Sequence, residues 1–174
     1  MGEIMKPNVT PEAERAIQIL ETRWANVSPR NLPYHVLLLS KLIDRATSQH
    51  VRDVAGLTLA EWRALAHLDY LKCGTSRQIA NLAMVDPAEV SRALGTLETR
   101  GLVIREANPR NRKSSLVSLT DQGRVLHDAI REQRGKFFED WVSELTEEER
   151  GHFDAMLRSI IRGIIRTAPH MISP

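Results

Sequence analysis

Apolar side chains recur every three or four residues along most of this chain, a spacing typical of amphipathic helices. It predicts helices over about 11–26, 34–54, 58–71, 75–83, 87–100, 120–145 and 146–168. The pattern changes where two short apolar runs, Leu102 to Ile104 and Leu116 to Val117, favour strands. We therefore expect a mainly α-helical protein with a single β-hairpin.

The helix over 87–100 has the clearest boundaries. Asp86 is a preferred N-cap residue, Pro87 suits the first helical position, and Glu89 stands three residues past the cap. Gly101 tolerates the left-handed conformation that closes many helices. One face of this helix should pack inward and leave the other free; the packing positions are Val90, Leu94 and Leu97.

A second helix precedes this one at the spacing of a helix-turn-helix. Thr75 and Gln78 have the spacing of a capping box, and Ile79 and Leu82 give the helix an apolar edge. The connection from Met84 to Asp86 has the length of a helix-turn-helix turn. The two helices together are therefore predicted to form a nucleic-acid-reading pair.

The predicted hairpin has a basic tip, which favours contact with a polyanion through counterion release. A charged run is more often a solvated loop, but its place directly behind a helix-turn-helix favours DNA contact. Between residues 100 and 113 a single acid, Glu106, stands against the bases Arg100, Arg105, Arg110, Arg112 and Lys113.

These motifs together resemble the winged-helix core of MarR-type transcriptional regulators, and the resemblance extends over about residues 33–166. The family usually has Asp where Asn108 and Asn111 stand, and often Arg in place of Lys113. The matching motifs are Asp86-Pro87, Val90-Ser91-Arg92, Leu97-Glu98, Arg100-Gly101-Leu102-Val103, the wing Asn108 to Lys113, and Leu119-Thr120 with Gly123.

The resemblance implies one domain over 1–174, with a winged helix-turn-helix core with a two-stranded β-wing over 58–118. Residues 11–54 and 120–168 would form a helical dimerisation region. The last helix carries a broad apolar stripe that needs a cover. Either a second copy or residues 11–26 of the same chain could supply it. The stripe consists of Phe153, Met156, Leu157, Ile160, Ile161, Ile164 and Ile165.

As a homodimer, the protein would place two recognition helices, 87–100, in successive major grooves of a near-palindromic operator. The wing over 105–115 would lie on phosphates or in the minor groove. For Arg92 the alternative is an intrahelical pair with Glu89 or with another partner three or four residues away. For Ser76 and Thr96 it is capping or helix solvation. Base contacts are expected from Pro87, Ala88, Ser91 and Arg92, phosphate contacts from Ser76, Arg77 and Thr96, and wing contacts from Arg110, Arg112 and Lys113.

The resemblance also implies regulation, most simply a repressor that releases double-stranded DNA when a small, often aromatic, effector binds between the dimer helices and the winged domain. Ordinary core packing is the alternative for each candidate pocket residue. Cys73 offers a redox-sensing alternative. The candidate effector-binding residues are His35, Leu39, Trp62 and His67.

Composition narrows the function classes. The net charge of the 174 residues is only +2, so DNA binding must depend on where the charge lies. From residue 139 to 154 there are seven acids and one base, so this end should face away from DNA. The sequence shows no phosphate-binding glycine loop, no nucleophile with a nearby base and no metal-ligand spacing among its six histidines. We therefore expect neither an enzyme nor a bound cofactor or metal.

The single cysteine excludes an intramolecular disulfide, and residues 1–10 contain no apolar run of the kind found in signal peptides. The longest apolar run, Val36 to Leu39, is too short to cross a membrane. These features predict a cytoplasmic protein. A winged domain used for protein contact rather than DNA binding is the second class of function that fits the pattern.

Overall fold

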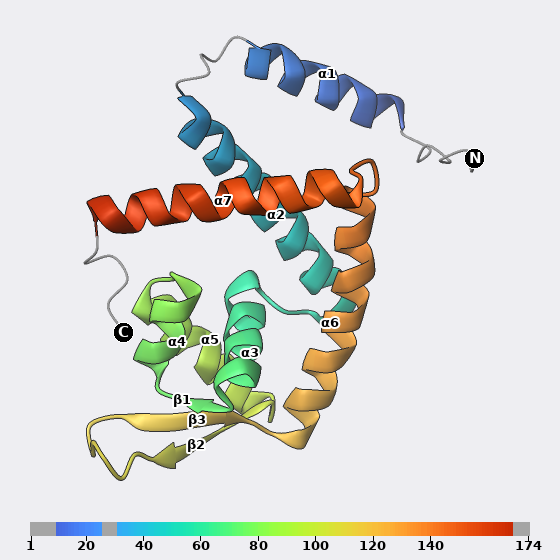
Figure 1. Ribbon diagram of the computed structural model, residues 1–174. Helices are drawn as coiled ribbons and strands as arrows, with labels where there is room; N and C mark the ends of the chain where they lie inside the picture. Colours follow the sequence, from blue (N-terminus) through green and yellow to red (C-terminus); the bar gives the residue numbers. More distant parts are fainter. Residues whose placement is uncertain (1–9, 26–30, 169–174) are drawn as a thin grey trace. The chain divides into compact units, whose positions relative to one another are not determined.

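The structure, a computed structural model, describes residues 10–25 and 31–168 and is mainly α-helical with a small antiparallel sheet (Figure 1). The predicted fold class is thus confirmed. The chain forms two compact units that divide within one helix, between Ala46 and Thr47. The elements are α1 (Pro11–Ala25), α2 (Leu32–Ala55), α3 (Leu59–Leu71), β1 (Cys73–Gly74), α4 (Ser76–Ala83), α5 (Pro87–Thr99), β2 (Val103–Ala107), β3 (Ser115–Leu119), α6 (Asp121–Trp141) and α7 (Glu147–Thr167).

In the first unit, α1 begins at the predicted cap and buries no side chain. The Ala13 N–H donates to Thr10 Oγ1 at 3.3 Å. Asn26, the last residue of the predicted helix, lies outside the described residues. The ring of Trp24 stacks on His35 at the start of α2, with 4.0 Å between centroids. Pro33 lies in the first turn of α2, where a helix needs no proline N–H.

The apolar row along the middle of α2 is not buried by the described residues. Leu39, Leu42 and Ile43 are 37–39% exposed. Nearer its C-terminus, by contrast, α2 buries Val51 completely. Helical spacing identifies the apolar face of a helix, but it does not show whether the same chain covers that face.

In the second unit, α3, α4 and α5 surround one apolar core that the sheet and α6 complete (Figure 1). Val51 and Leu57, at the end of α2 and just after it, also join this core. The side chains predicted to pack inward from α5 are buried, which confirms the helical phase of α5. The largest fully buried side chains are Leu57, Leu65, Leu68, Ile79, Leu94, Leu97, Val51, Val90 and Val117.

The sheet has three strands in the order β1-β3-β2 rather than the two that were predicted. The predicted hairpin is present, with Val103 opposite Leu119 and Ala107 opposite Ser115. The added strand is Cys73–Gly74, which pairs with β3. Two residues are too few to show the alternation of a strand, so only the pairing with β3 identifies it.

The end of the sheet is joined tightly to the start of α6. Thr120 caps α6 by accepting from the Gly123 N–H at 3.0 Å, and its own hydroxyl donates to the Gly101 carbonyl at 2.7 Å. A Cβ atom at Gly123 would collide with the backbone carbonyl of Leu102. Glycine is therefore required at this point, and the match of Gly123 to the MarR-type motif has a steric reason.

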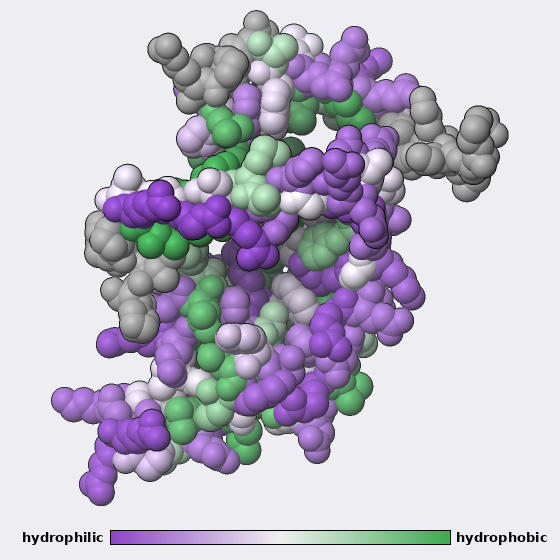
Figure 2. Space-filling model, in the orientation of Figure 1, coloured by the Kyte–Doolittle hydropathy of each residue, from purple (hydrophilic) through white to green (hydrophobic). Residues whose placement is uncertain are grey.

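The C-terminal helix buries no side chain within the chain. Its N-terminus has the predicted capping box between Thr146 and Glu149. The side of α7 that faces the viewer in Figure 2 is largely hydrophilic, and hydrophobic atoms appear below its C-terminal half. Within the described ranges, no helix combines the length and the apolar character needed to cross a bilayer. The exposed large apolar side chains of α7 are Phe153, Met156, Ile161, Ile164 and Ile165.

Candidate nucleic-acid interface

The connection between α4 and α5 has the predicted length and an unusual backbone. Thr75 and Gln78 form both hydrogen bonds of a capping box at the start of α4. Met84 ends α4 in the left-handed conformation, with φ 50°, where a glycine is common. A side chain in this conformation costs about 1–2 kcal/mol. Part of that cost is offset because the Val85 N–H donates to the Ala80 carbonyl at 3.1 Å.

The start and end of α5 are those expected from the sequence. Asp86 Oδ1 accepts from the N–H groups of Ala88 and Glu89 at 2.8 and 3.3 Å. Gly101 follows the helix with φ 70°. Because Leu94 and Leu97 are fully buried, the opposite face of α5 is free to meet a ligand.

The free face of α5 carries the side chains predicted to read bases, namely Pro87, Ala88, Ser91 and Arg92, and all are exposed. Arg92 makes no side-chain hydrogen bond or ion pair with any described residue, so the intrahelical pair with Glu89 is not formed. Thr96 donates its hydroxyl to the Arg92 carbonyl at 3.3 Å, which is the helix-solvation alternative. The face therefore offers one long, unpaired donor among small side chains.

The N-terminus of α4 holds the other two residues predicted to contact phosphate. Ser76 is half-buried at the first position of the helix, and Arg77 is exposed. Capping is done by the preceding Thr75, so Ser76 is not the cap. Arg77 forms no ion pair with a described residue.

The wing tip keeps its cations free. The Asn108 Oδ1 atom accepts from the Arg110 N–H, and the Asn111 Oδ1 atom accepts from the Lys113 N–H, both at 3.0 Å. These two turns shape the tip with neutral amides, so no carboxylate there offsets the charge. Arg110, Arg112 and Lys113 are exposed and unpaired among the described residues, and Figure 2 shows the wing tip as hydrophilic.

Two of the five cations counted in the sequence do not belong to the wing tip. Arg105 forms an ion pair with Glu98 of α5 at 2.7 Å. Arg100 donates to the carbonyls of Ala55 and Gly56. The pairing partners lie 7 to 45 positions away, so the linear count of charges overstated the basic tip.

The four candidate effector residues are divided between the two units. His35 and Leu39 lie on α2 in the first unit, whereas Trp62 and His67 lie on α3 in the second. Trp62 is 7% exposed, which agrees with the core-packing alternative. Burial, followed by the nearby charge of Arg63, lowers the pKa of His67 below its ordinary value.

Sequence reasoning missed Arg134, which lies between two aromatic rings. Its guanidinium carbon is 5.1 Å from the ring centroid of Trp62 and 4.5 Å from that of Phe138. The Arg134 Nη1 atom is buried without a partner in the described part of the chain. Burial, and then the charge of Arg63, lowers its pKa. The i, i+4 spacing of Arg134 and Phe138 could have identified this contact.

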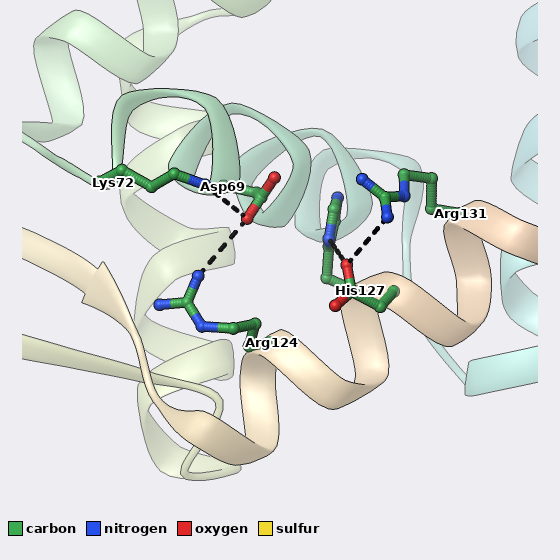
Figure 3. A network of polar contacts seen from close by, with 6 residues as sticks. Asp69, Lys72, Arg124, His127 and Arg131 are labelled. Atoms are coloured by element: carbon green, nitrogen blue, oxygen red, sulfur yellow. Dashed lines mark hydrogen bonds and ion pairs between the residues drawn. The ribbon is translucent and has the colours of Figure 1, made fainter.

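A polar network joins the C-terminal end of α3 to α6 (Figure 3). Asp69 accepts from Lys72 at 3.1 Å and pairs with Arg124 at 3.5 Å. The hydrogen bond from Lys72, opposed in part by desolvation, is the largest cause of the lowered pKa of Asp69. His127, whose ring stacks on Trp62, has its Nδ1 atom 3.1 Å from Asp128. These contacts fix α6 against the helix that supports α5.

Two further kinds of site would need a cluster of metal ligands or a reactive cysteine. Among residues 10–25 and 31–168, no group of three or more His, Cys, Asp and Glu side chains could hold a metal ion. His170 lies outside the described residues. Cys73 is exposed and is a free thiol.

Comparison with known proteins agrees with this geometry. Residues 57–115 match the model described as the MarR family. An uncharacterized HTH-type transcriptional regulator of Bacillus subtilis, YdgJ, is 35% identical over 66 residues, which are 38% of this chain and 40% of YdgJ. The HTH-type transcriptional regulator PecS of Dickeya dadantii is 28% identical over 130 residues, 73% of this chain and 78% of PecS.

A solved structure extends the likeness to the helices around the winged segment. A mutant of MarR from E. coli, complexed with operator DNA, superposes with a TM-score of 0.66 at 21% identity. The superposition covers 75% of this chain and 93% of that one. At this identity the likeness establishes the fold.

Proposed function

Because this chain is a MarR-family winged helix-turn-helix transcriptional regulator, we propose that it binds a near-palindromic operator as a homodimer and releases it when a small effector binds. The family match identifies a DNA-binding regulator rather than an enzyme. Repression is the simplest sign of such regulation, since an operator-bound dimer blocks transcription until it leaves. We expect the protein to act in the cytoplasm, where it meets DNA.

One observation carries the proposal: the outer face of α5 presents the unpaired Arg92 beside a wing with three unpaired cations. In the major groove, Arg92 would donate two hydrogen bonds to a guanine. Pro87, Ala88 and Ser91 would meet base edges or thymine methyl groups. Phosphates would be contacted by Ser76, Arg77, Thr96, Arg110, Arg112 and Lys113.

Operator binding by a related fold supports this arrangement, because a mutant of E. coli MarR has been solved with its operator DNA. A wing whose tip holds no carboxylate partner for its arginines suits a phosphate backbone or a narrow minor groove. Residues 87–100 would thus read sequence, and residues 105–115 would add affinity.

The dimer is inferred from apolar surface that one chain leaves open. Five of the seven side chains in the apolar stripe of α7 are 37–58% exposed. Three of them, Ile161, Ile164 and Ile165, line a groove of about 640 Å³ with α4. Exposed apolar area of this extent is typical of an association surface. A two-fold dimer would also place the two α5 helices about one DNA turn apart.

An effector site is proposed around Trp62 and Arg134 of the second unit, with the predicted His67 as a further candidate. His35 and Leu39, which lie in the first unit, stay predictions. Arg134 has a buried Nη1 atom without a partner among the described residues, and its charge lies against the face of Trp62. A buried, unpaired guanidinium nitrogen favours an anionic ligand. A small aromatic anion would supply both a charge partner and a ring to pack on.

The experiment is selection of bound sequences from a random double-stranded pool, followed by titration of the enriched site over a salt series. We expect a near-palindrome, with affinity that falls steeply as salt rises. Arg92→Gln tests the base contact at the enriched site. Its matched control is Lys136→Gln, which removes an exposed charge on α6. No enrichment at low salt would contradict operator binding and favour a protein-contact module.

A further inference from the structure

Arg100 connects the reading helix to a distant part of the chain. It ends α5, and its side chain reaches the last carbonyl groups of α2 and the glycine that follows. Its Nη2 atom donates to Ala55 O at 3.1 Å, and its Nη1 atom donates to Gly56 O at 3.2 Å. Both terminal nitrogens of Arg100 therefore donate to carbonyl groups at the C-terminal end of α2 and directly after it.

These carbonyls are open to a side chain because the end of α2 closes without them. The Gly56 N–H donates to Arg52 O at 2.9 Å, and the Leu57 N–H donates to Val51 O at 3.3 Å. The carbonyls that follow have no helical partner. A guanidinium meets two adjacent acceptors at once and places a positive charge at the negative end of the helix dipole. A lysine ammonium lacks this planar fork.

Apolar packing alone would not fix the orientation of the two helices. Val51 and Leu57 attach the end of α2 to the core that α5 shares, but hydrophobic contact has no preferred direction. Two hydrogen bonds from one planar group do have a direction. Arg100 thus adds a directional constraint to this apolar attachment.

We propose that Arg100 is a positioning residue for operator recognition: it sets the orientation of α5 relative to α2, and so the half-site spacing that the dimer accepts. The inference rests on the proposed function, in which α2 belongs to the dimerisation region and α5 enters the major groove. Arg100 acts through α2 and does not contact DNA in this role.

The test uses the full-length protein and duplexes in which the selected half-sites are separated by the preferred spacer or by one or two base pairs more or fewer. Arg100→Gln should bind the preferred spacing about fivefold or more weakly, since two hydrogen bonds are lost. Its affinities for the other spacings should change little, so the spacing preference flattens. Arg100→Lys should lie between the two.

The dependence on salt separates positioning from phosphate contact. Arg100→Gln should keep the parent's salt slope, whereas the control Lys113→Gln should weaken binding at every spacing and flatten the slope by about one unit. A uniform loss with a flatter slope in Arg100→Gln would show that Arg100 contacts phosphate. An unchanged spacing preference would also overturn the inference.

A second measurement applies if Arg100→Gln fails to fold. In Arg100→Lys the amides of Gly56 and Leu57 should exchange hydrogen faster than in the parent, because the end of α2 is held less firmly. Unchanged hydrogen exchange would show that Arg100 does not hold the end of α2. A parent without any spacing preference would refute the proposed function and this inference together, while a preference retained by Arg100→Gln would refute the inference alone.

Discussion

Residues 57–119 bury most of their large apolar side chains within one chain, whereas α7 leaves most of its own exposed. Leu65, Leu94 and Leu97 are fully buried, but Met156 and Ile161 on α7 are more than half exposed. Both regions have strong helical spacing and well-formed N-caps. The difference shows that local sequence signals determine where a helix forms, while neighbouring elements determine whether its apolar face is buried. The winged segment buries most of its apolar side chains with elements of the same chain, whereas those of α7 are left open for the second copy that we propose.

The largest expected effect is in the completed region. Leu94→Ala should lower the free energy of unfolding by about 2–5 kcal/mol, because it opens a cavity in a filled core. Urea unfolding followed by circular dichroism measures this change. A loss below about 1 kcal/mol would contradict the described packing of α5.

The next largest effect is expected in α7, whose apolar side chains are mostly exposed. Ile164→Asp should leave the fold intact but weaken the dimer by about 30-fold or more, because a charge would enter the centre of an apolar interface. Light scattering at micromolar concentration reports the mass. Ser159→Asp is the control, with the same charge on the other side of α7. A parent that is a monomer, or a dimer that both variants retain, would contradict the assignment.

On the reading surface, Arg92→Ala should cost about 1–3 kcal/mol at one base position and relax specificity there. Arg112→Ala should weaken binding to all sequences and reduce the salt slope by about one unit. Titration of the selected operator and of its single-base variants measures both. If the parent and both variants bind alike, the surface has been misassigned.

The smallest effect is expected at the ion pairs. The pKa of Asp69 is lowered in the folded state, so the carboxylate stabilises the fold above its unfolded pKa, and that stability is lost as pH falls through the lower folded value. Asp69→Asn should cost under about 1 kcal/mol at pH 7, and the difference from the parent should disappear in strong acid.

Asp154→Asn makes the comparison sharper, because Asp154 pairs with Arg158 of its own helix and with no other described residue. Its effect should be smaller than that of Asp69→Asn, which separates two elements of the winged region. Thermal melts of both variants from pH 2 to 7 test the order. Equal losses would show that the Asp69 network does not hold α6 to α3.

The features that the sequence predicted well depend on residues a few positions apart. The capping boxes at Thr58 and Thr75 and the cap at Asp86 need only three neighbouring residues, and all three are present. The hairpin was also predictable, because its strands flank a short turn. The spacing of neighbouring residues is enough to predict such contacts.

The features that were missed depend on distant or missing partners. Strand β1 exists only because Cys73 and Gly74 pair with β3 some 45 residues later. The apolar side of α2 stays exposed because the chain does not cover it. Charge counting could not find that Arg100 pairs with Gly56, which lies 44 positions earlier. The predicted DNA-contacting residues remain predictions, although α5 and the wing present most of them to solvent.

Arg100 lies at the C-terminal end of α5, so a tilt around this residue moves the N-terminal end of the helix the most. With 13 residues, α5 is about 20 Å long. A tilt of about 10° around the Arg100 end would move the Asp86 end by about 3.4 Å, the rise of one base pair. A rotation of this size would therefore displace the end of the helix that carries Pro87 and Ala88 by a distance comparable to one base-pair step.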